Sequence, residues 1–204
     1  YYYQNQISIS ATANYGYHFT SWHDGNTANP RMITVTQDTA FTANFAVNIY
    51  AVSATSNNNT MGSVSGGGNY NYLSLVALTA TPAYGYHFEQ WNDGLSNNPR
   101  TINVIQDTMF MAQFAANTYS ITVQANDPRM GSAYGSGYFS YNTTTALLGT
   151  ATYGYHFVQW SDGNTENPRT VPVTQNAIYT ALFEINTYAI SVGSSNPAIG
   201  SAAG

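Results

Sequence analysis

The sequence contains no cysteine and no lysine, and only 6% of its 204 residues are charged. Without cysteine, neither a disulfide framework nor a thiolate metal site can form. Four basic residues and a net charge of −5 do not make the dense basic footprint that phosphate neutralisation needs, so we expect no nucleic-acid partner. No run of about 18 apolar residues occurs, so we expect no membrane span in this sequence.

The residues that are present favour a folded protein with an uncharged polar surface. Hydrophobic residues make up 43% of the chain and aromatic residues 15%, which argues against disorder. Charged residues are far below the roughly 25% of typical soluble domains, so Asn, Thr, Ser, Gln and Tyr must supply solubility. Such a surface is typical of an extracellular protein that packs against copies of itself or carries sugars.

One motif occurs three times. The pattern Tyr-Gly-Tyr-His-Phe-x-x-Trp-x-Asp-Gly, followed by Asn-Pro-Arg, begins at Tyr15, Tyr84 and Tyr153, and all three tryptophans lie within it. The step is about 69 residues, so the chain is one module used three times. The residues that we select as its structural motif are Tyr17, Phe19, Trp22, Asp24, Gly25, Arg31, Tyr86, Phe88, Trp91, Asp93, Gly94, Arg100, Tyr155, Phe157, Trp160, Asp162, Gly163 and Arg169.

The hydrophobic pattern of each module predicts short β-strands. Apolar and polar residues alternate with period two along 7–12, and again on both arms of a hairpin at 33–45. No segment of ten or more residues shows a helical period. We therefore predict an all-β fold: a tandem array of small antiparallel β modules with five or six strands each and little or no helix.

Two positions depart from simple alternation. Phe19 and Trp22 are three residues apart, so a regular strand would place them on opposite faces; because both should be core residues, we expect a bulge or a strand end near Ser21. Pro172 cannot donate a hydrogen bond to a sheet, so we expect it on the outside of an edge strand or at a bulge.

The repeat also predicts domain boundaries. Residues 1–48 are module 1, which lacks its first strands; 49–117 and 118–186 are the complete modules 2 and 3; 187–204 are the first strands of a fourth module. Tyr1 matches Tyr70 and Gly204 matches Gly135, so the chain starts and stops at the glycine-rich turn of the module. No Gly/Ser linker separates the modules, so we expect them to be stiffly coupled.

The long motif, with its final Asn-Pro-Arg-x-(Ile/Val)-x-Val hairpin, resembles the divergent internalin B-repeat family shared by Listeria and Bacteroides surface proteins. The resemblance covers the whole chain. It implies small β modules related to the β-grasp fold, in tandem on secreted or surface-anchored bacterial proteins. It implies no catalytic residues and no cofactor.

The motif residues have both structural and functional interpretations. The Phe and Trp side chains are expected in the core rather than on a sugar-stacking platform, since large apolar residues at these spacings mostly bury. A metal site needs several convergent ligands, so we expect a structural or surface role for the recurring histidines His18, His87 and His156. The Asp-Gly loop resembles an oxygen-rich calcium-binding loop, but the second copy lacks the Asn that follows Asp-Gly in the first. Turn formation and an ion pair between Asp24 and Arg31 therefore explain the recurring Asp better than calcium binding does.

Catalysis and modification have little support in the sequence. There is no Ser/His/Asp set and no cysteine nucleophile, so we expect no enzyme activity and no cofactor. Asp38-Thr39-Ala40 and Asp107-Thr108-Met109 resemble the acceptor pattern of Bacteroides-type O-glycosylation, which makes Thr39 and Thr108 candidate glycosylation sites.

Two functions from different classes remain open. The first is a structural stalk, spacer or filament segment of a bacterial surface or secreted adhesin-like protein. Its partners would be neighbouring repeats of the same or an identical chain, with strand addition completing modules between chains. The second is a repeated module that binds carbohydrate or a host ligand, with surface glycans or host protein as partners.

Overall fold

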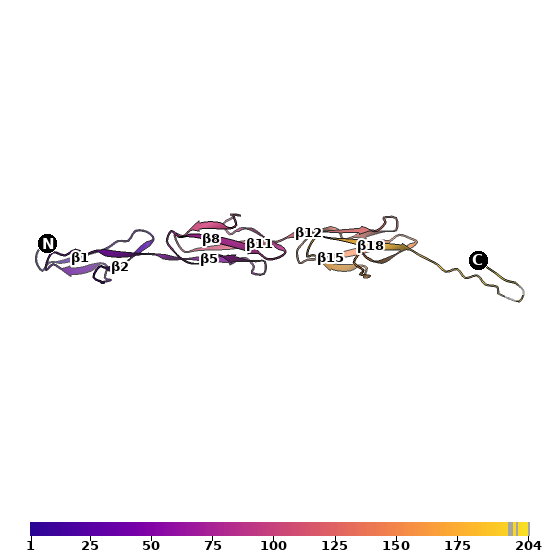
Figure 1. Ribbon diagram of the computed structural model, residues 1–204, viewed down its shortest axis with the longest axis horizontal. Coiled ribbons are helices and arrows are strands. Elements are labelled where there is room, and N and C mark those ends of the chain that lie inside the picture. The colour runs from indigo at the N-terminus through magenta and orange to yellow at the C-terminus, as the bar shows by residue number, and fades with distance from the viewer. Residues whose placement is uncertain (196–197, 199, 204) are drawn as a thin grey trace. The chain divides into compact units, whose positions relative to one another are not determined.

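A computed structural model describes residues 1–195, 198 and 200–203. These residues form β-strands and no helix, so no described helix is long and apolar enough to cross a membrane. The chain divides into two compact units, residues 1–115 and 116–204, and each is described by itself (Figure 1). Modules 1, 2 and 3 below are the repeat copies at 1–48, 49–117 and 118–186.

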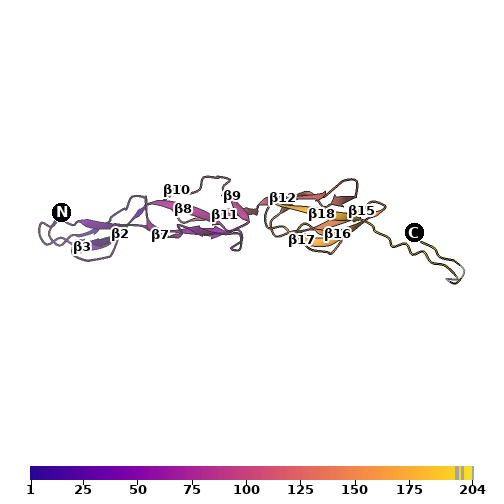
Figure 2. The same ribbon diagram turned by 45° about the vertical axis from the view of Figure 1, so that its right-hand side comes forward.

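Module 2 consists of seven strands in two sheets. They are β5 (Ile49–Ser56), β6 (Gly62–Ser65), β7 (Gly68–Asn71), β8 (Leu75–Pro82), β9 (Tyr86–Trp91), β10 (Arg100–Asn103) and β11 (Thr108–Ala116). One sheet has the order β7-β5-β11-β9 and the other β10-β8-β6. Figure 2 shows the same strands from a second direction.

Module 3 repeats this arrangement strand for strand. Its strands are β12 (Thr118–Ala125), β13 (Gly131–Tyr134), β14 (Gly137–Ser140), β15 (Thr144–Ala151), β16 (Tyr155–Trp160), β17 (Arg169–Pro172) and β18 (Ala177–Ile185). The sheets are β14-β12-β18-β16 and β13-β15-β17. Two modules of different sequence thus share one topology, which is what a repeated folding unit requires.

The all-β prediction is confirmed, but the antiparallel description is incomplete. The first and last strands of a module lie side by side and parallel at the centre of the four-stranded sheet: β5 with β11, and β12 with β18. Every other pairing with a known register is antiparallel. Alternation of side chains is the same in both kinds of sheet, so the sequence pattern did not reveal this pair.

Each complete module buries its own core between the two sheets. In module 2 the core is centred on Trp91, Leu78 and Phe114; in module 3 the same positions hold Trp160, Leu147 and Phe183. The predicted bulge is present in module 1 between Phe19 and Ser21 and at the same place in module 3. Pro172 lies exposed on β17, an edge strand, as predicted.

Module 1 contains the last four strands of the pattern. They are β1 (Gln6–Ile9), β2 (Tyr17–Trp22), β3 (Arg31–Thr34) and β4 (Ala43–Val47), in two-stranded sheets β1-β3 and β2-β4. The described residues from 187 onwards, predicted as the first strands of a fourth module, form no strand. They are drawn without arrows in Figures 1 and 2.

Candidate functional site

The repeated motif folds into a loop that is hydrogen-bonded to the buried indole of its own tryptophan. The indole of Trp22 donates a hydrogen bond to the Ala28 carbonyl at 2.8 Å, and Trp91 and Trp160 donate to the equivalent carbonyls at 2.9 Å. The three tryptophans are 4%, 0% and 0% exposed. A buried indole needs a partner for its N–H, and the loop supplies it.

At the other end of the same loop, an asparagine side chain forms two hydrogen bonds with the backbone of a neighbouring segment. Asn29 donates to the Ala11 carbonyl at 2.6 Å and accepts from the Ala11 amide at 2.9 Å. Asn98 and Asn167 bind Ala80 and Gly149 in the same way. The loop therefore extends the edge of the neighbouring strand with a side-chain amide in place of a backbone peptide.

The Asp and Arg of the motif form an ion pair in every module. The N–O distances are 2.7 Å for Arg31 and Asp24, 2.8 Å for the second copy and 2.7 Å for the third. Each guanidinium also lies over an aromatic ring, with 5.0 Å from the Arg31 Cζ to the Phe41 centroid, 4.6 Å and 5.1 Å in the other copies. The arginine thus joins the loop, through its charge and a ring contact, to an aromatic residue that lies on the last strand in modules 2 and 3 and just before it in module 1.

These contacts shift the acidities of the loop carboxyls. The hydrogen bond from Arg31 lowers the pKa of Asp24, and the hydrogen bond from Arg169 lowers the pKa of Asp162. Partial burial is the largest influence on Asp93 and raises its pKa, but hydrogen bonds and the charge of its arginine outweigh it, so the net shift is downward. All three carboxylates are held as anions by their arginines.

The loop therefore has a chemical explanation as a structural element. Its carboxylate forms an ion pair with the arginine, its indole donates a hydrogen bond to a backbone carbonyl, and its asparagine side chain forms hydrogen bonds with a neighbouring backbone segment. No group of three acidic or histidine side chains gathers among the described residues, and no buried side-chain nitrogen or oxygen of theirs lacks a hydrogen-bond partner.

The histidines take part in local contacts. The Nδ1 atom of His18 lies 2.7 Å from the Oδ1 atom of Asn48, and His156 lies 2.9 Å from Asn186 in the same way. His23, which occurs only in module 1, accepts a hydrogen bond from the Thr42 amide at 3.3 Å. The first two connect the motif strand to the residue where one module ends.

The two candidate glycosylation threonines lie at the turn before the last strand. Thr39 is exposed, and Thr108 is half-buried as the first residue of β11. Both hydroxyls donate to a backbone carbonyl two residues earlier, at 3.2 Å and 3.1 Å. Their modification stays a prediction.

Asn48, between modules 1 and 2, uses all its polar groups within unit 1–115. Its amide donates to the Gly16 carbonyl at 2.8 Å, and its carbonyl accepts from the Tyr72 amide at 2.8 Å. Its side chain contacts His18, as described, and donates to the Tyr50 hydroxyl at 3.4 Å. One residue thereby bonds the motif turn of module 1 to two segments of module 2.

Aromatic rings pack around this asparagine. The ring of Tyr72 lies edge-on to Tyr15, Tyr17 and Tyr50, with centroids 5.5, 5.9 and 6.4 Å apart. The Tyr15 hydroxyl donates to the Ile105 carbonyl of module 2 at 2.9 Å. Edge-to-face pairs of this kind add about 0.5–1.5 kcal/mol each beyond area burial, so the junction is a packed contact as well as a connection.

Gly16 is the point of closest approach in the junction. Its φ of +85° lies in the left-handed region, and a Cβ atom there would stand 2.1 Å from the Tyr72 ring. Sequence reasoning selected neither Asn48 nor Tyr72 as a site residue. Their signal was exact recurrence, as Asn117, Asn186 and Tyr141 at the same step.

The fold defines a class: a tandem-repeat protein of small all-β modules, in which the recurring motif makes the same loop contacts in each copy. The chain belongs to the divergent InlB B-repeat domain family, whose model matches residues 1–49, 52–118 and 119–187. This is a repeat-domain family and not a known family of enzymes.

Comparison with solved structures finds a weak likeness. The Bacillus anthracis TIE protein is 10% identical, with a TM-score of 0.35, over 87% of this chain. The chain spans half the length of that protein. The search of curated proteins found no match.

Proposed function

We propose that this chain is a stalk, spacer or filament segment of a bacterial cell-surface or secreted adhesin-like protein. In this function the modules carry no separate chemistry; they set a distance and a direction between whatever they connect. The partners are neighbouring repeats. The extracellular surface location is part of the proposal and is supported by the family and by the neutral polar composition.

The junction around Asn48 is the observation that supports this function most directly. A flexible linker would leave the polar groups between modules to water. Here one asparagine makes four hydrogen-bond contacts, and Gly16 admits the Tyr72 ring at a distance that no side chain would allow. Such a contact favours one orientation of module 1 on module 2, which a spacer needs.

A distance measurement between the two modules tests this proposal. The chain has no cysteine, so Ser8→Cys and Ala77→Cys, at equivalent exposed strand positions, can be spin-labelled uniquely. The labelled chain is diluted into unlabelled chain so that only distances within one chain contribute. A narrow distance distribution is expected.

The control inserts Gly-Gly-Ser after Asn48, which leaves both modules intact but separates the contacts of the junction. Its distribution should broaden to that of a flexible linker. A parent distribution as broad as that of the insertion would end the spacer proposal.

The ligand-binding alternative has one observation in its favour. On the outer face of module 3, Tyr134 and Leu148 are cross-strand neighbours and both are exposed, where module 2 has Ser65 and Thr79. Exposed aromatic faces are what sugars stack on, but the three buried tryptophans are not available for this. The double change Tyr134→Ser and Leu148→Thr should abolish any glycan binding that an array of immobilised glycans detects.

A further inference from the structure

Arg129 is the one basic residue of this chain that lies outside the repeated motif. The chain has no lysine, and its other three arginines, Arg31, Arg100 and Arg169, form the motif ion pairs. The side chains of those three are 17%, 11% and 8% exposed, whereas Arg129 is exposed. A protease of the trypsin type binds a lysine or arginine side chain in its specificity pocket and cleaves the peptide bond that follows. Arg129 is therefore the accessible candidate for such a protease.

The backbone at the three motif arginines is protected as well. Each of them is the first residue of a paired strand, and the pairs are Arg31 with Ile9, Arg100 with Leu78 and Arg169 with Leu147. A protease binds its substrate as a single extended segment, so cleavage after these arginines requires the strand to leave its sheet. Leu78 and Leu147 are fully buried, so in modules 2 and 3 this step opens the core.

Arg129 lies instead in the turn 126–130 between β12 and β13. Asp127 shapes this turn: its carboxylate accepts the Arg129 amide at 2.8 Å, and its carbonyl accepts the Met130 amide at 3.0 Å. Exposed loop tips are preferred sites of proteolytic nicking, because they open without unfolding the core. The equivalent positions of the other copies hold Thr60 and Ala198, so the arginine occurs in one copy of this turn.

We propose that the Arg129–Met130 bond is a cleavage site for an arginine-specific protease of the trypsin type, and that the cut leaves module 3 assembled from two pieces. Hydrolysis consumes one water molecule. The C–N bond breaks, the water oxygen bonds to the Arg129 carbonyl carbon, and a hydrogen goes to the Met130 nitrogen. At neutral pH the new ends are a carboxylate on Arg129 and an ammonium group on Met130. The pieces are residues 1–129, which include β12, and residues 130–204.

The position of β12 in its sheet holds the two pieces together. β12 is paired on both sides, antiparallel with β14 and parallel with β18 along the ladder from Ile121 to Ala125. Both neighbouring strands follow Arg129 in the chain, so all of these backbone hydrogen bonds join one piece to the other. Ile121 and Val123 are 1% and 7% exposed, so β12 also contributes two buried side chains to the core of the second piece.

The residues beside the cut are held on both sides of it. The Asn126 side chain donates to the Phe183 carbonyl and accepts from the Phe183 amide, both at 3.1 Å. The Asn126 amide donates to the Ala181 carbonyl at 3.0 Å. On the other side, Met130 packs against the core of module 3. Cleavage therefore releases only the turn between Asn126 and Met130.

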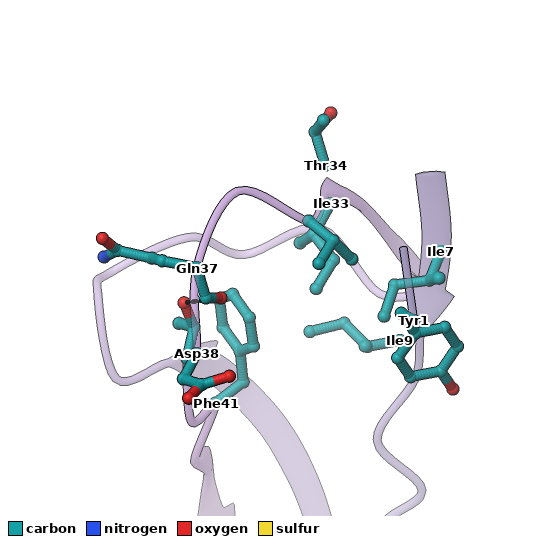
Figure 3. Close-up of a pocket in the computed structure, with 10 residues that line it drawn as sticks. Tyr1, Ile7, Ile9, Ile33, Thr34, Gln37, Asp38 and Phe41 are labelled. Carbon is teal, nitrogen blue, oxygen red and sulfur yellow. Dashed lines mark hydrogen bonds between the residues drawn. The ribbon is translucent and has the colours of Figure 1, made fainter. Parts of the chain in front are cut away.

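Module 1 shows the kind of apolar face that the first strands cover in module 3. Residues 1–48 contain no equivalent of β12, β13 or β14, and Ile33 and Val35 line a cavity of about 460 Å³ there (Figure 3). The equivalent Val171 and Val173 are 3% and 0% exposed and share one core with Ile121. Loss of β12 would expose part of this apolar surface to water, which favours retention of the first piece.

Digestion of the whole folded chain with trypsin tests the proposal. Mass spectrometry should show two products, 1–129 and 130–204, whose masses add up to that of the chain plus one water. The two products should elute together from a gel-filtration column in buffer and separately in urea. A first cut after Arg31, Arg100 or Arg169, no cut of the folded chain, or pieces that separate in buffer would each overturn the proposal.

Two variants at Arg129 identify the cleaved bond. Arg129→Gln should slow the first cut of the folded chain at least about tenfold, because the protease then depends on the small population in which a core strand is open. Arg129→Lys should still be cut by trypsin but not by a protease that accepts arginine alone. Cleavage of Arg129→Gln at the rate of the parent contradicts the assignment.

Module 2 offers a matched control for the turn itself. Thr60 is exposed, and the Asn58 side chain accepts its amide at 2.9 Å, as Asp127 does for Arg129. Thr60→Arg should therefore add a second cut, after residue 60, and absence of that cut would contradict the view that this turn decides access. The proposal goes beyond the spacer function and does not depend on it. Cleavage at several arginines, together with a narrow distance distribution between modules 1 and 2, would overturn it and leave the spacer function standing.

Discussion

The two glycines that open the motif turn in modules 1 and 3 provide a matched test of the junction. Gly16 and Gly154 have φ values of +85° and +88°. They differ in surroundings: a Cβ atom on Gly16 would meet the Tyr72 ring at 2.1 Å, whereas nothing lies within 4 Å of one on Gly154. Alanine at either position costs the same backbone strain, and only at Gly16 does it also disturb the contact between modules.

The expected magnitudes follow from these two contributions. Left-handed backbone costs a non-glycine residue about 1–2 kcal/mol, so Gly154→Ala should reduce the free energy of unfolding of module 3 by that amount. Gly16→Ala should cost the same and a further ~1–3 kcal/mol for displacing a packed ring. Because Tyr72 belongs to module 2, that module should also lose stability.

The three tryptophans allow each module to be observed separately. Their indole N–H resonances are followed by NMR during urea unfolding, one reporter for each module. The double variant Gly16→Ala with Tyr72→Ala should lose the additional cost, because the ring that the new methyl group displaces is gone. Equal losses for Gly16→Ala and Gly154→Ala would refute the view that the junction is a close-packed contact.

Three further predictions concern module 3. Leu147→Ala should cost about 2–5 kcal/mol of unfolding free energy in urea titrations, since Leu147 is fully buried; the neighbouring exposed Leu148→Ala should cost less than about 0.5 kcal/mol, and similar losses would contradict the core assignment. The hydrogen bond from Arg169 lowers the pKa of Asp162 below its usual 3.8. The stability that this ion pair contributes is therefore present above pH 3.8 and is lost as the pH falls through the lower folded-state pKa. The urea midpoint of the parent should fall more steeply below pH 4 than that of Asp162→Asn, and parallel curves would contradict a stabilising role of the Arg169–Asp162 pair. Asn126→Ala should cost about 1–3 kcal/mol and speed amide hydrogen exchange at the end of β18, because it leaves a backbone amide and carbonyl without their partner; unchanged exchange would contradict this.

Local features of the fold follow closely from the sequence. The spacing of Phe19 and Trp22 predicted a bulge, because two core residues three apart cannot share one face of a regular strand, and the bulge lies between Phe19 and Ser21. Pro172 was placed on an edge strand because it lacks an N–H, and β17 is an edge strand. These predictions succeeded because each depends on the chemistry of one or two residues.

Features that depend on distant residues were missed. Five or six strands were predicted and seven are present in each complete module, because the glycine-rich segment reads as a turn although Gly68–Asn71 forms β7. The structural roles of Asn48 and Asn126 were also missed. An asparagine in a loop has no pattern of its own; its role becomes visible only when the backbone that it binds is in place.

The parallel pairing of β5 with β11 determines how a module responds to a pulling force. Because the first and last strands run the same way, the chain enters the module at one end of this pair and leaves at the other. Tension along the chain therefore slides β5 against β11 and loads the ladder from Val52 to Ser56 in shear, so its hydrogen bonds must yield together rather than one after another. Forced unfolding is governed by the rate of unfolding, and this geometry places the parallel ladder of the module in the line of load.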